Sequence, residues 1–225
     1  MNNNDDLCKC GHARSEHCLD DECCVFNKDE WGGACLIYKC FCGAFETPKE
    51  IMKDFKKVTN LQERIKAGEK FEFELFWKGP FSQWANQGFT VDDVFYKTAE
   101  HWMMVEKARL FGDEDTIQKI LEADYPKIAK DLGRQVKNYD EEVWIEHRYN
   151  IVLSGNRYKF TQNNEYKAIL LGTGSKILVE ASPVDRIWGI GLAEDDKAAK
   201  DPLMWKGLNL LGFVLTDLRE ELKHA

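Results

Sequence analysis

The distribution of cysteine divides this chain of 225 residues more sharply than any linker does. All eight cysteines lie between Cys8 and Cys42, and the remainder has none. A segment of that size is too small to bury a core of its own and needs cross-links or a metal ion. The longer remainder holds most of the aromatic residues and needs no such support. We therefore predict a Cys/His-rich module (residues 1–48), a connecting amphipathic helix (49–70) and one larger domain (71–225).

Cysteine and histidine in the N-terminal module are spaced as in closed zinc sites. Two clusters, each followed by glycine, are separated by a loop, and glycine permits the tight backbone that turns successive ligands toward one ion. The first residues are polar and do not resemble a secretory signal, so we expect reduced thiols, which favour a structural Zn²⁺ over disulfides. The alternatives are reduced or disulfide-linked cysteines that bind no metal, and cysteines with a redox or catalytic role. The predicted ligands are Cys10, His17, Cys35 and Cys40, with Cys8, His12 and Cys42 as substitutes.

Charge and hydropathy exclude two classes of protein. The net charge of −8 argues against a protein that coats nucleic acid by bulk electrostatics. No apolar run approaches the roughly 20 residues that a membrane span needs, so we expect a cytoplasmic protein. The connecting helix has one basic face, which is interpreted as a solvated surface in preference to a nucleic-acid contact.

Hydrophobic periodicity predicts an α+β fold that is mainly helical with a small sheet. Strand–helix alternation of the parallel α/β kind is missing, and so is a glycine-rich phosphate loop. Several helices are expected to stop at glycine. The predicted strands are 71–77, 89–91, 94–96 and 176–181, and the predicted helices are 48–68, 99–111, 114–132, 140–154, 161–172 and 202–222.

Three stretches carry residues suited to chemistry. On the helix 99–111, Glu100 and Lys107 lie two turns apart on one face, which indicates either a functional pair or a salt bridge. The loop 185–192 combines an acid, a tryptophan and two glycines, which suits either a stacking platform or a tight turn around a core tryptophan. Glycines within 205–212 require close packing or close approach of a ligand.

Taken together and in this order, these stretches resemble the NADAR family, also called YbiA-like. The resemblance covers roughly residues 76–222 and does not include the cysteine module. Its motifs are FSQW (81–84), FTVDDVFYKTAEHWMMVEKARLF (89–111), GR (133–134), DRIWGIGL (185–192) and WKGLNLLG (205–212). Gln83 stands where many members have Asn, and Asp93 stands where a hairpin glycine is common.

The resemblance implies an N-glycosidase that hydrolyses a bond between ribose C1′ and nitrogen. One substrate route removes ADP-ribose from guanine bases of nucleic acid, reversing a DNA ADP-ribosyltransferase toxin, which would be the partner. The other cleaves ribosylamino-pyrimidine phosphates of the riboflavin pathway. A non-catalytic module that binds ADP-ribose or NAD is the competing class, and the presence of two acids favours the enzyme.

The resemblance also assigns roles to residues. The motif glutamate falls on Glu100, the motif lysine on Lys107 and the loop acid on Asp185, and these are the predicted catalytic residues. An oxocarbenium-like state at C1′ needs a carboxylate nearby, so Glu100 is the first choice for that role. Catalysis is expected to need no metal or redox cofactor. The predicted substrate-binding residues are Phe81, Ser82, Trp84, Arg134, Trp144, Trp188, Gly189, Gly191 and Asn209.

The N-terminal module is expected to bind about one zinc ion per chain, because its cysteine and histidine clusters suit a closed four-ligand site. Metal analysis of protein purified under reducing conditions measures this directly. A metal-free protein with an ordered module and intact disulfides would contradict the prediction.

Overall fold

The computed structural model describes residues 49–224. The predicted zinc ligands, Cys8, Cys10, His12, His17, Cys35, Cys40 and Cys42, lie outside the described residues. Within that range, no group of three or more His, Cys, Asp or Glu side chains is arranged to hold a metal ion. None of the described helices combines the length and apolar character that a bilayer span requires.

The described part is mainly helical, as predicted, with two small sheets. The predicted connecting helix is α1 (Lys49–Lys66). The other elements in chain order are β1 (Phe73–Phe76), β2 (Phe89–Val91), β3 (Val94–Tyr96), α2 (Ala99–Leu110), α3 (Glu114–Glu122), α4 (Pro126–Gly133), α5 (Glu141–Thr161), α6 (Asn164–Gly172), β4 (Ile177–Glu180), the 3₁₀ turns η3 (Lys197–Lys200) and η4 (Pro202–Met204), and α7 (Leu210–Lys223).

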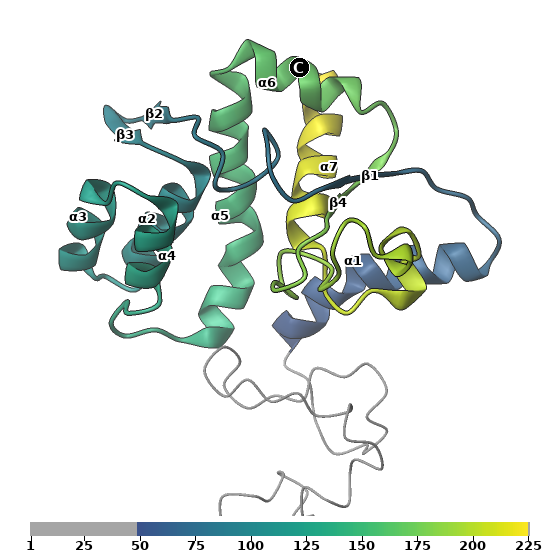
Figure 1. Cartoon of the computed structure of the whole chain (residues 1–225). Helices are drawn as coiled ribbons and strands as arrows, with labels where there is room; N and C mark the ends of the chain where they lie inside the picture. Colours follow the sequence, from purple (N-terminus) through teal and green to yellow (C-terminus); the bar gives the residue numbers. More distant parts are fainter. Residues whose placement is uncertain (1–48, 225) are drawn as a thin grey trace, which may run out of the picture. The chain divides into compact units, whose positions relative to one another are not determined.

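The helices form two groups on either side of α5. Figure 1 shows α2, α3 and α4 on one side of this long helix and α7 on the other, in agreement with the contacts of α5 with α2 and with α7. Strand β4 lies against α7 and pairs in parallel with β1, with Phe76 opposite Glu180. This pairing joins segments about 100 residues apart in sequence, and it places the end of β4 near the loops of the predicted site.

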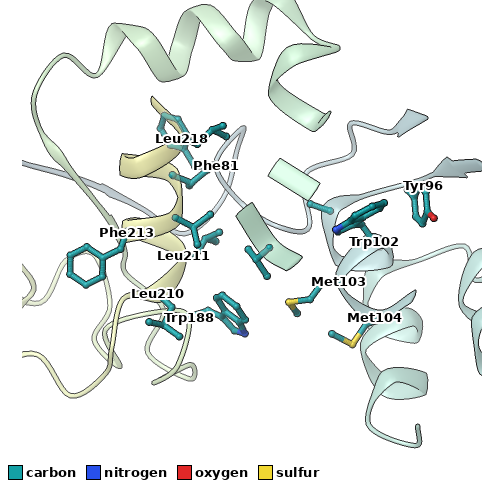
Figure 2. Packing of buried hydrophobic residues seen from close by; sticks show 14 of the residues in the cluster. Phe81, Tyr96, Trp102, Met103, Met104, Trp188, Leu210, Leu211, Phe213 and Leu218 are labelled. Atoms are coloured by element: carbon teal, nitrogen blue, oxygen red, sulfur yellow. The ribbon is translucent and has the colours of Figure 1, made fainter. Parts of the chain in front are cut away.

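The buried core is continuous across these groups. Figure 2 shows side chains of α2, such as Met103 and Met104, and of α7, such as Leu210 and Leu211, within one cluster that also includes Trp188. Helix α1 contributes Val58 and Leu61 to the same cluster. The predicted connecting helix is therefore packed into the larger domain by its apolar face.

Three predicted helix boundaries were wrong, two for a local reason and one because of long-range packing. The predicted helix 114–132 is broken after Glu122, and a new helix, α4, begins at Pro126. Proline is tolerated in a first turn, because a backbone N–H at that position would have no hydrogen-bond partner within the helix. Gly155 does not end α5; a Cβ there would lie 2.3 Å from the Trp102 ring, so glycine permits close helix packing. The last helix begins at Leu210, because Asn209 has a left-handed backbone with φ of 54°.

The predicted hairpin 89–91/94–96 is confirmed as β2 and β3. Its two-residue turn, Asp92 and Asp93, has φ values of 47° and 64°. Positive φ at both central positions defines the type I′ turn, whose twist matches that of the strands, and glycine is preferred at the second position.

Asp93→Gly is expected to raise the free energy of unfolding by up to about 1 kcal/mol, since glycine adopts a left-handed backbone without the steric cost that other residues incur. Asp93→Ala, which keeps a Cβ and loses the polar side chain, is the matched control and should lower it. Urea denaturation of the three proteins tests the order Gly, Asp, Ala. Equal stability of the glycine and alanine variants would contradict it.

Candidate active site

Glu100 lies in the first turn of α2, where the positive end of the helix dipole favours an acid. Thr98 caps the helix by accepting a hydrogen bond from the N–H of His101, and the N–H of Glu100 donates to the carbonyl of Gln83 at 3.0 Å. Glu100 is only 3% exposed, and its Oε1 accepts no hydrogen bond from any residue that the structure describes. A buried carboxyl oxygen without a partner costs stability unless a ligand uses it.

Burial raises the pKa of Glu100 from its ordinary value of 4.5 to about 7. Lys130 opposes this shift, and the negative charge of Asp185 adds to it. A hydrogen bond from the Trp84 side chain and the charge of Arg134 also lower the pKa of this carboxyl. A carboxyl group that titrates near neutral pH is suited to accept or release a proton during a reaction.

Asp185 is held at the start of the loop 185–192 by three contacts. Its Oδ1 accepts hydrogen bonds from the backbone N–H groups of Ile187 at 2.9 Å and Trp188 at 2.8 Å. Its Oδ2 lies 3.8 Å from Nζ of Lys130. Lys130, on α4, therefore faces both predicted acids. Sequence reasoning missed it, since nothing in the pattern distinguishes it from Lys127, the other lysine of that helix.

Glu180, at the end of β4, is a third acid that sequence reasoning missed. Its Oε2 is buried and accepts no hydrogen bond from the described residues. Burial and, to a smaller extent, the charges of Asp185 and Glu100 together raise the pKa of this carboxyl to about 8, against the opposing charge of Lys130. The sequence holds one signal: strand alternation places Glu180 on the face of Leu178, which is fully buried.

Lys107 has aromatic neighbours and lies within the electrostatic range of Arg134. Its Nζ is 4.2 Å from the Tyr139 ring centroid and 5.6 Å from that of Trp144. Burial and the charge of Arg134 lower the pKa of Lys107 to about 8, against the charge of Glu141. The cations that act on Glu100 are Lys130 and Arg134, and Lys107 is not among them.

The FSQW segment is anchored to α5 by buried polar contacts. The carbonyl of Ser82 accepts a hydrogen bond from Nζ of Lys159 at 2.8 Å, and Oε1 of Gln83 accepts one from Asn156 at 2.8 Å. Lys159 is fully buried, and that burial lowers its pKa to about 7. These bonds fix the backbone whose Gln83 carbonyl holds the N-terminus of α2, so they position Glu100.

The predicted binding residues differ in what they can offer a ligand. Phe81 is buried against Phe76 and Phe160, and Trp144 and Trp188 are buried in the core. Trp84 is 45% exposed. Among the predicted tryptophans, Trp84 therefore presents a face to solvent.

The glycines and the asparagine of the last two motifs hold loops together. A Cβ on Gly189 would lie 2.8 Å from the carbonyl oxygen of Glu180, and one on Gly207 only 2.3 Å from that of Gly189. Gly191 has a left-handed φ of 68°. The Asn209 amide donates to the carbonyl of Leu178 at 3.0 Å and accepts from the N–H of Glu180 at 2.9 Å. These contacts position the end of β4 against the loop that carries Asp185.

An open cavity of about 610 Å³ lies beside the N-terminal end of α2. Trp84, which hydrogen bonds to Glu100, and Thr98, the cap of α2, both line it. Phe95 and Tyr125 on its rim are 59% and 66% exposed. Exposed aromatic rings beside a cavity suit stacking on a planar ligand such as a nucleobase. The remaining lining residues are Asn86, Gly88, Lys97, Asp124 and Pro126.

The Glu100→Gln variant is expected to be more stable than the wild type at pH 8 and as stable as the wild type at pH 4. The folded state holds the Glu100 proton more tightly than the unfolded state, so wild-type stability falls as pH rises from 4.5 to about 7. The glutamine variant lacks this loss, which is on the order of 2–3 kcal/mol. Urea denaturation across pH tests it, with the exposed Glu142→Gln as the control for removing one charge. A constant difference between variant and wild type would contradict the assignment.

Comparison with known proteins identifies the family of this site. The chain is 44% identical over 146 residues to N-glycosidase R617 of Acanthamoeba polyphaga mimivirus, covering 63% of this chain and 86% of that protein. It is 31% identical over 144 residues to N-glycosidase YbiA of Escherichia coli strain K12, covering 64% of this chain and 81% of that protein.

The fold agrees with these relatives. The NMR structure of the E. coli protein YbiA matches with a TM-score of 0.57 and 28% identity, over 69% of this chain and 88% of that chain. The model of the NADAR domain matches residues 72–223, a range that includes all three acids and excludes the cysteine module. The resemblance found in the motifs is thereby confirmed, and the chain belongs to the NADAR domain family.

Proposed function

We propose that this chain is an N-glycosidase that hydrolyses a ribose C1′–N bond, and that it removes ADP-ribose from guanine in nucleic acid. The observation that carries the proposal is the buried carboxyl of Glu100, whose Oε1 has no hydrogen-bond partner among the described residues. Asp185 and Lys130 lie beside it. The names of the relatives, N-glycosidase R617 and N-glycosidase YbiA, support the reaction class.

The chemistry follows from the charge that develops at C1′. As the C1′–N bond breaks, its electron pair moves to nitrogen and the sugar carbon becomes cationic, so a nearby carboxylate stabilises the transition state. A water molecule forms the new C1′–O bond and loses a proton, which ionised Glu100 accepts. Asp185 is held in one orientation by its loop, as a group that binds ribose hydroxyls must be.

Two features support ADP-ribose on a base as the substrate class. Lys107 and Arg134 bring two cations close together at one side of the site, and paired cations suit a pyrophosphate. On another side, the rim of Trp84, Phe95 and Tyr125 offers aromatic rings for a base. A protein of net negative charge can act on nucleic acid in this way because it captures one modified base and does not coat the strand.

Glu100→Gln is expected to lower kcat and kcat/KM together by about 10²–10³-fold while ADP-ribose still binds with near wild-type affinity. The missing charge matters when C1′ becomes cationic and not before. Turnover is measured on an ADP-ribosylated guanine oligonucleotide and on a ribosylamino-pyrimidine phosphate, side by side, and binding by calorimetric titration.

Glu106→Gln, on the same helix and paired with Arg109 outside the site, is the matched control. It should retain turnover. Release of sugar phosphate from the pyrimidine substrate alone would assign the enzyme to small metabolites. Near wild-type turnover by Glu100→Gln would overturn the role of this carboxyl, and binding of ADP-ribose without turnover by the wild type would favour a reader.

A further inference from the structure

Glu180 has no role in the chemistry described so far, although its carboxyl shares the site with Glu100 and Asp185. We propose that Glu180 is the general acid of the reaction and gives its proton to the nitrogen that leaves C1′. This inference rests on the proposed N-glycosidase function and adds a catalytic residue to it.

The backbone of Glu180 is held in place by its neighbours. Its N–H donates to Oδ1 of Asn209 at 2.9 Å, and its carbonyl accepts from the N–H of Ile190 at 2.9 Å. Gly189 packs so closely that a Cβ there would lie 2.8 Å from this carbonyl. Glu180 is thus held on both sides of its peptide, as a group that must reach one reacting atom requires.

The surroundings of the Glu180 carboxyl favour its protonated form. Oε2 of Glu180 is buried and has no hydrogen-bond partner among the described residues. Burial of a charged oxygen that accepts no hydrogen bond is disfavoured, whereas a carboxylic acid brings its own O–H donor. A substrate nitrogen in the site would be the missing acceptor for that donor.

Glu180 and Glu100 differ in the charged groups that act on their carboxyls. Asp185 on the loop and Glu100 on α2 disfavour the ionised form of Glu180, and Lys130 on α4 is the cation that favours it. Glu100 is favoured in its ionised form by Lys130, by Arg134 and by Trp84. Asp185 keeps its own hydrogen bonds to the loop backbone. Of the two buried carboxyls, Glu100 is therefore the one that ionises first, and Glu180 keeps the proton.

The proposed step balances. The Glu180 O–H bond breaks and its proton bonds to the leaving nitrogen, which receives the electron pair of the C1′–N bond. The oxygen of water bonds to C1′, and ionised Glu100 accepts the proton that water loses. Transfer of one proton from Glu100 back to Glu180 restores the site, so the net reaction is hydrolysis.

Glu180→Gln keeps the size of the side chain and removes its acidic proton. We expect kcat to fall by about 10²–10⁴-fold with ADP-ribose affinity unchanged. The alkaline decline of kcat, which reports loss of the acid's proton, should disappear in this variant. Glu180→Asp, which restores a carboxyl group, should recover part of the rate together with the alkaline decline.

Glu74→Gln is the control on the neighbouring strand, where Glu74 pairs with Lys176 outside the site. It should keep the wild-type rate and pH profile. A Glu180→Gln variant that loses rate while its alkaline decline is unchanged would show a structural role and overturn the proposal. A variant with the wild-type rate would overturn it as well.

A substrate-free measurement separates this proposal from the proposed function. In ¹³C NMR of protein labelled at glutamate side chains, the carboxyl signal that is lost in Glu180→Gln identifies Glu180. Its titration near or above neutral pH supports the acid role, and titration below pH 5 overturns it whatever the turnover. A wild type that hydrolyses neither substrate refutes the proposed function, and the acid role falls with it.

Discussion

The approach of the last two loops to strand β4 is the constraint on which the site depends. Asn209 has a left-handed backbone. Its side-chain amide donates to the carbonyl of Leu178 and accepts from the N–H of Glu180, as a neighbouring strand would do. Gly212 makes this possible, since a Cβ there would lie 2.1 Å from the Leu178 carbonyl oxygen. The two residues help to satisfy the edge of β4 that does not pair with β1.

The buried titratable groups in and around the site lower the stability of the fold. Glu100 and Glu180 are buried with their pKa values raised to about 7 and about 8, and Lys159 is buried with its pKa lowered to about 7. Each group destabilises the fold in its charged form. Such groups persist where their protonation serves a purpose. Lys159 differs from the acids, because it hydrogen bonds the Ser82 carbonyl and so supports the segment that holds α2.

Patterns in the sequence predicted the helices and strands whose formation depends on residues close in sequence. The helix predicted over 99–111 is α2, which Thr98 caps, and the hairpin and the strand 176–181 are confirmed. One wrong boundary, at Gly155, comes from long-range packing against Trp102, whereas Pro126 and the left-handed Asn209 account for the other two. The acids of the site differ in the same way, since one was predictable from a local motif and the other was not. Glu100 lies in a recognisable motif, whereas Glu180 gains its surroundings only when β4 pairs with β1 and the loop 185–192 folds back onto it.

Glu100 and Glu180 belong to different halves of the helical framework. Glu100 is carried by α2, which packs with α3 and α4, and Glu180 by β4, which packs with α7; α5 lies between the two groups (Figure 1). The span from one carboxyl to the other is therefore set by how tightly the two groups close on α5. Because packed helices slide in small steps and do not deform continuously, a shift of one group against α5 would widen or narrow the space for water and substrate without changing any residue that contacts them.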